Sequence, residues 1–125
     1  MAIEKFEDVK AWPAARELAQ VVYRASGQGA FAQDFALRDQ IRRAAGSVMH
    51  NIAEGFDAGS DAEFIRFLRY SRRSATEVQS QLYIALDQQY ISEAEFQATY
   101  DKSTEVKKLV NGFIAYLRKS SQVVE

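Results

Sequence analysis

Cysteine is absent from the 125-residue sequence, and histidine occurs once, at His50. The missing thiols exclude disulfides, thiolate metal ligands and cysteine nucleophiles together. A metal site at His50 would need several further ligands, and Glu54, four residues later, is the one candidate on the same helical face. Two ligands are too few for a specific site. The sequence therefore predicts no metal and no cofactor, and it predicts that His50 is a boundary residue bonded to a neighbour.

Long apolar runs are also missing, and none approaches the roughly 20 residues that a membrane helix needs. The first ten residues, MAIEKFEDVK, carry acids and lysines where a signal peptide would need an apolar run. We therefore expect a cytoplasmic protein without membrane contact. Hydrophobic and charged contents of 47% and 26% are ordinary globular values, so one domain over residues 1–125 is expected.

Constellations that carry catalysis are lacking too. Ser60, Ser71 and Ser74 have no second histidine that could activate them, and no glycine-rich phosphate loop follows a strand. The sequence predicts no enzyme activity and identifies no small-molecule substrate.

The sequence also lacks a large excess of charge of either sign, because its net charge is −1. That balance argues against a protein that coats nucleic acid by bulk electrostatics. The charges are nevertheless uneven, because residues 38–73 hold seven arginines, no lysine and five acids. Arginine favours forked contacts to carboxylates, phosphates or backbone carbonyls. Ion pairs between helices or subunits are the favoured interpretation, and a phosphate-binding face is the alternative.

The arginines fall into rows at helical spacing. The candidate contacts to nucleic acid or another partner are Arg38, Arg42, Arg43, Arg66, Arg69 and Arg73. We expect nearby acids to consume these charges and to leave only weak nucleic-acid binding, even at low salt. The acids considered are Glu54, Asp57, Asp61, Glu63 and Glu77.

With one proline and six glycines, the sequence has few residues that interrupt helices. Its apolar residues recur with a period near 3.5. Pro13 falls within the first two turns of the first helix, where a missing N–H costs little. A loop is expected from Gly27 to about Asp34, and a polar, frayed tail over 120–125. The predicted helices span about 8–26, 34–56, 61–88 and 92–119.

Two helix starts carry a capping-box pattern, at Ser60 with Glu63 and at Ser92 with Glu95. No segment alternates as a strand would, and the connections are short. Four such helices predict an all-α, antiparallel up-down-up-down four-helix bundle. The stripe that best shows the period is Leu37, Ile41, Ala44, Val48 and Ile52.

Polar residues inside the second helix need partners. Asn51 is a poor mid-helix residue unless its amide is used, so we expect it to form a register-fixing cluster with Arg43, Ser47 and Glu54. A binding site is the less favoured alternative. Apolar residues off the main stripes indicate a homo-oligomer. These are Ile65, Phe67, Tyr70, Tyr83, Ile84, Tyr90 and Tyr116.

Several motifs together resemble a known family. They are Phe6-x-x-Val9-x-x-Trp12, Leu37-x-x-Gln40-Ile41-x-Arg43-Ala44-Ala45-x-Ser47, Asn51-Ile52-Ala53-Glu54-Gly55, Glu63-Phe64 with Phe67-Leu68, and Ser74-x-x-Glu77 with Gln81-Leu82. Over residues 6–118 the chain resembles the four-helix-bundle proteins first met as products of intervening sequences in bacterial large-subunit ribosomal RNA genes.

This resemblance implies a pentameric ring, no enzyme activity and an unsettled biological role. It also implies structural roles for the motif residues Arg43, Ser47, Asn51, Glu54 and Gly55. A related branch, the accessory proteins of diversity-generating retroelements, is strongly basic and partners nucleic acid and reverse transcriptase. The present chain departs from that branch in its net charge of −1. It also departs from the family, which usually has a glycine before the serine of the third helix, because here Arg73 precedes Ser74.

The main hypothesis is therefore a non-enzymatic, homo-oligomeric scaffold or adaptor whose partner, besides itself, is unknown. The alternative is a nucleic-acid-binding accessory protein that uses an arginine-rich face of the oligomer.

Overall fold

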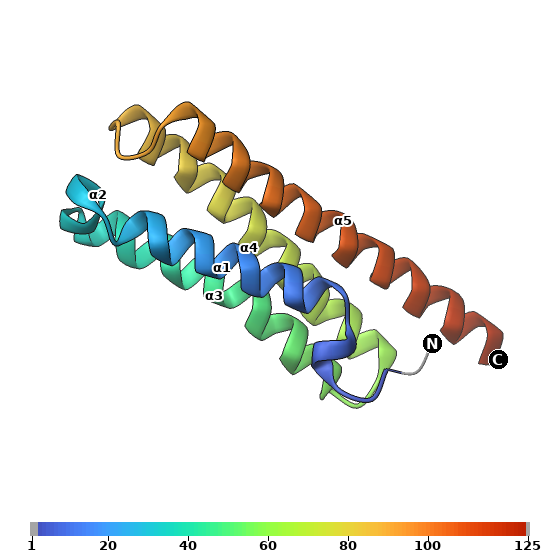
Figure 1. Ribbon diagram of the computed structural model, residues 1–125. Coiled ribbons are helices and arrows are strands. Elements are labelled where there is room, and N and C mark those ends of the chain that lie inside the picture. Colours follow the sequence, from blue (N-terminus) through green and yellow to red (C-terminus); the bar gives the residue numbers. More distant parts are fainter. Residues whose placement is uncertain (1–2, 125) are drawn as a thin grey trace.

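Four long helices form an antiparallel bundle in the computed structural model, which describes residues 3–124 and the side chains as far as residue 120 (Figure 1). Each long helix packs against two others, so that α1, α3, α4 and α5 close a square in that order. The described residues contain no strand, and the all-α prediction is confirmed. The elements are η1 (Phe6–Asp8), α1 (Ala11–Ser26), α2 (Gly29–Gln33), α3 (Phe35–Phe56), α4 (Asp61–Asp87) and α5 (Glu93–Val124).

The connection before α3 is not the loop that the sequence predicted, because it contains the short helix α2. Gly29 turns the chain with φ +53°, a conformation that glycine adopts without strain. Phe31 is then buried and stacks on Tyr90, with ring centroids 5.4 Å apart. Burial of Phe31 explains why this stretch is ordered although it lacks helical periodicity.

The ends of the first and last helices also differ from the prediction. A 3₁₀ turn occupies the start of the chain, and α1 begins at Ala11, which makes Pro13 its third residue. At the other end, α5 continues to Val124, whereas fraying was expected from Ser120. No proline or glycine interrupts that stretch, and extending an existing helix costs far less than starting one.

One predicted capping box is complete and the other is half formed. Ser92 and Glu95 each accept from the other's backbone N–H, at 3.1 and 2.9 Å. At α4, Ser60 Oγ accepts from the N–H of Glu63, but the carboxylate of Glu63 binds Arg66 at 2.7 Å. That hydrogen bond lowers the pKa of the Glu63 carboxyl below its usual value.

The core lies along the shared axis of the bundle, where the predicted stripes meet. Ile52 on α3 and Leu68 on α4 are fully buried, as are Val106 and Val110 on α5. At Gly55, α3 lies close against the start of α4. The burial of Gly55 at this contact requires a residue without a side chain.

Candidate partner-binding surfaces

The first predicted arginine row is used by the fold itself. Arg42 donates from Nε to the hydroxyl of Ser26 at 2.8 Å and from Nη2 to the carbonyl of Tyr23 at 3.1 Å. Its guanidinium also stacks over the Tyr23 ring, 4.6 Å from the centroid. These carbonyl and hydroxyl groups belong to the C-terminal turn of α1, where a cation is favoured. Arg42 is therefore a helix cap.

Arg38 has a similar structural role one turn earlier. It donates to the carbonyl of Ala32 at 3.1 Å and pairs with Asp39 at 3.0 Å. Its guanidinium lies 4.8 Å from the ring centroid of Phe35. Asp39 is not one of the acids that we expected to pair with the arginines. The carbonyl of Ala32 is the more buried of the two partners of Arg38. Arg38 and Arg42 thus fasten α2 and α1 to α3.

The second row lies on α4 and faces solvent in the isolated chain. Arg66, Arg69, Arg72 and Arg73 surround Tyr70 and line a hollow of about 330 Å³. Tyr70 is the centre of this cluster, which we call the arginine recess. Arg66 donates to its hydroxyl at 3.0 Å, and the guanidinium of Arg73 lies 4.8 Å from its ring centroid.

The members of the arginine recess differ in how they are held. Arg66 is paired with Glu63, and Arg72 donates to Asn111 Oδ1 on α5 at 2.6 Å. Arg69 and Arg73 are exposed, and the described part of the chain gives them no carboxylate partner. Of the acids expected to neutralise this row, Glu63 alone forms an ion pair with it in that part.

The polar cluster expected around Asn51 exists, but with a different membership. The amide of Asn51 donates to the carbonyl and hydroxyl of Ser47, at 2.8 and 2.9 Å. Ser74 on α4 donates to the same Ser47 hydroxyl at 2.9 Å. Arg43 and Glu54 are exposed and stand outside this cluster. Ion pairs of long, exposed side chains contribute little free energy, so Arg43 and Glu54 are not held in the cluster. The short side chains of Ser47 and Ser74 meet directly between α3 and α4.

His50, which the sequence placed at the boundary of the core and bonded to a neighbour, is exposed. Among the residues with described positions, no group of three or more His, Cys, Asp or Glu could hold a metal ion. Within the same range, no helix is long and apolar enough to cross a membrane.

Large apolar side chains lie on the surface, some of them at positions that the sequence did not single out. Tyr83 packs against Phe96 and Tyr100, with ring centroids 4.8 and 6.2 Å apart, and Ile84 follows it on α4. The sequence placed Tyr83, Ile84 and Tyr116 off the main stripes but missed Tyr23 and Phe35, which lie against Arg42 and Arg38. Between 49% and 59% of the surface is exposed in Tyr23, Phe35, Tyr83, Ile84 and Tyr116.

Known proteins share this fold and these motifs. The sequence model of the 23S rRNA-intervening sequence protein family matches residues 7–112. The chain belongs to this family. A solved protein of the S23 ribosomal protein family from Bacteroides thetaiotaomicron VPI-5482, described as of unknown function, is 26% identical with a TM-score of 0.77. The similarity covers 85% of the present chain and 96% of that protein.

No curated protein matches the chain. Membership in the 23S rRNA-intervening sequence protein family confirms the resemblance inferred from the motifs. It assigns no activity, because the solved relative has no known function.

Proposed function

We propose that this protein is a non-enzymatic helical scaffold or adaptor that assembles with copies of itself in the cytoplasm. The observation that supports this best is the set of large apolar side chains left half exposed on the single chain. Water-exposed aromatic clusters on a small domain mark interaction surfaces. Closed symmetric assemblies are the commonest way to cover such surfaces with a single gene product.

The ridge formed by Tyr83 and Ile84 at the C-terminal end of α4 is the part of this surface that we assign to self-association. Both side chains are about half exposed, and Tyr83 packs against the buried Phe96 and the half-buried Tyr100 on α5. A pentamer is the proposed number of copies, and it rests on the family resemblance. The motif residues Arg43 and Glu54 are exposed on α3 and are available for contacts between copies.

Light scattering coupled to size-exclusion chromatography tests this assembly. We expect a mass of about five times the 14.1 kDa of one chain at micromolar concentration. Replacing Tyr83→Ser together with Ile84→Ser should shift the mass toward one chain, and Lys119→Ser is a matched surface control. A wild-type mass of one chain at micromolar concentration would contradict the proposal.

A second function, nucleic-acid binding, has its own supporting observation in the arginine recess. Arg69 and Arg73 are exposed beside Tyr70, and among the described residues Glu63 is the one acid paired with the cluster. Guanidinium groups bind phosphate and an aromatic ring can stack on a base. Repetition of the recess in an oligomer would multiply these weak contacts.

Fluorescence anisotropy with a short single-stranded RNA separates the two functions. For the scaffold we expect weak binding at low salt that falls steeply as salt rises. Binding that is submicromolar near about 150 mM salt would favour the second function if Arg69→Ala with Arg73→Ala abolished it. The control is Arg118→Ala with Lys119→Ala, which removes two exposed charges from α5 instead.

A further inference from the structure

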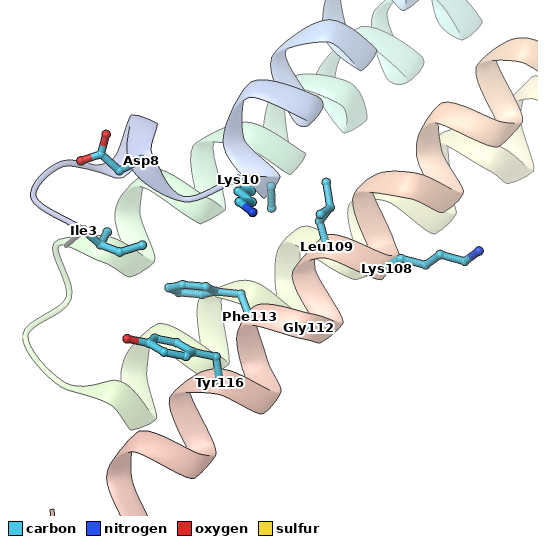
Figure 2. A pocket seen from close by; sticks show the side chains of 9 residues that line it. Ile3, Asp8, Lys10, Lys108, Leu109, Gly112, Phe113 and Tyr116 are labelled. Atoms are coloured by element: carbon cyan, nitrogen blue, oxygen red, sulfur yellow. The ribbon is translucent and has the colours of Figure 1, made fainter. Parts of the chain in front are cut away.

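A second hollow lies between the start of α1 and the middle of α5 (Figure 2). Its volume is about 290 Å³, and its walls are mostly apolar. Small-molecule sites commonly measure about 300–1,000 Å³ and are mainly apolar with a few placed polar groups. The hollow is therefore suited to a small ligand. The apolar wall consists of Ile3, Ala11, Leu109, Gly112, Phe113 and Tyr116.

Gly112 creates the floor of this hollow. It lies within α5, where glycine is otherwise unfavourable, and an added Cβ would meet no atom within 4 Å. No backbone turn or close helix contact explains this glycine, unlike Gly55. The missing side chain leaves open space at this point of α5, where Leu109 and Phe113 also line the hollow (Figure 2).

The charges at the hollow favour an anion. Lys10 borders the hollow from the start of α1 and is exposed, whereas the Lys108 ammonium extends away from the hollow (Figure 2). Asp8 also borders the hollow, but its carboxylate points away and accepts from the backbone N–H groups of Glu4 and Lys5. In the described part of the chain, Lys10 has no carboxylate partner.

The start of α1 adds to this preference. Lys10 is the N-cap residue of α1, and the first turn of that helix carries no acidic side chain. The amino-terminal end of a helix has a partial positive charge that favours a nearby anion. The first turns of α4 and α5, in contrast, contain acids of their own. One ammonium at the rim, without an arginine fork, matches a single carboxylate better than a phosphate.

We propose that the hollow between α1 and α5 binds a compact amphipathic carboxylate. The apolar body of the ligand lies on Gly112 between Leu109 and Phe113, and its carboxylate pairs with Lys10. The occupant is thus a small aromatic or alicyclic acid. This site is separate from the α4 ridge assigned to self-association and from the arginine recess.

An NMR titration of the isotope-labelled protein with 2-naphthoate tests the proposal, with the uncharged 2-naphthamide as the matched probe. We expect saturable shifts of the amides of Lys10, Leu109 and Gly112 with the acid. We expect the amide to bind at least about tenfold more weakly than the acid, because the uncharged amide cannot form the charge-assisted contact with Lys10.

Two pairs of variants locate the binding. Gly112→Trp should fill the hollow and abolish binding, whereas Gly112→Ala leaves most of the volume and should retain it. Lys10→Gln should weaken the acid about tenfold and leave the amide unchanged, and Lys119→Gln is the control for removing a lysine elsewhere. Circular dichroism and the mass of each variant, measured alongside, show that folding and assembly are intact.

Equal binding of the acid and the amide, or retention of binding in folded Gly112→Trp, would overturn the proposal. An absence of shifts in the wild-type protein would also overturn it. The proposed assembly is unaffected by either result, because it depends on the measured mass and on the Tyr83 and Ile84 variants.

Discussion

Two helical glycines show how strongly the effect of a residue depends on its surroundings. At Gly55 an added Cβ would lie 2.8 Å from Phe64 Cδ1 and 2.9 Å from Phe67 Cβ. Such distances force α3 and α4 apart, because the Phe67 Cβ is fixed to the helix backbone and cannot turn away. At Gly112 the same methyl group would meet open space.

We therefore expect opposite effects from the same substitution. Gly55→Ala should lower the free energy of unfolding by about 1–3 kcal/mol through overpacking. Gly112→Ala should raise it by about 0.5–1 kcal/mol, because alanine loses less backbone freedom on forming a helix. Urea denaturation of both variants beside the wild type measures this difference. A stabilising Gly55→Ala would show that the two helices can separate at little cost.

Ile52 and Leu82 test the packing of the core at the same scale. Both are buried, with 0% and 3% of their surface exposed. Truncation to alanine should cost about 2–5 kcal/mol at either position, since it removes buried methyl groups and leaves a cavity. Ile52→Val, which removes one methylene, should cost about 0.5–1.5 kcal/mol. Denaturation midpoints that fail to follow this order would mean that the helix is rotated from its described phase.

Among the elements, the turn from α1 through α2 to α3 depends on side chains from distant positions. Asp34 caps α3 by accepting from the N–H of Leu37, and its other oxygen accepts from the hydroxyl of Tyr90 at 2.9 Å. That hydrogen bond raises the pKa of the Tyr90 phenol above its usual value. Arg42 secures the end of α1 in the same region. Asp34 thus ties this turn to the α4–α5 connection at one end of the bundle (Figure 1).

Arg42→Ala should remove the cap of α1 and cost about 1–3 kcal/mol, as the loss of hydrogen bonds to a charged group does. The buried hydroxyl of Ser26 would lose a partner and keep its own donation to the carbonyl of Val22 at 2.7 Å. Arg43→Ala, one residue later on the exposed face, is the control and should change stability by less than about 0.5 kcal/mol. Thermal unfolding of the two variants checks the contrast, and equal losses would refute a capping role for Arg42.

At the scale of the whole molecule, a net charge of −1 conceals separate surfaces of different character. The arginine recess, the Tyr83–Ile84 ridge and the apolar hollow lie on different parts of the α4 and α5 helices. In an assembly each would be repeated once per chain. Light scattering of the Tyr83 and Ile84 variants tests the ridge, RNA anisotropy tests the arginine recess, and the naphthoate titration tests the hollow.

The sequence by itself determined the helices and the core. Periodic apolar stripes and short connections are local patterns, and burial of one stripe per helix leaves few arrangements other than an antiparallel bundle. Ile41, Val48, Ile52 and Leu82 lie inside for this reason. The family motifs were equally readable, since they are properties of the chain alone. The short helix α2 was missed because a buried Phe31, and not local periodicity, holds it in place.

The tertiary structure alone decided what the polar side chains do. Arg42 and Arg43 are adjacent in sequence, yet one caps a helix 16 residues away at Ser26 and the other is exposed. A charged side chain takes whichever acceptor the packing brings within reach, so its partner cannot be read from spacing along one helix. The same holds for Gly112, whose open surroundings depend on where α1 begins beside α5.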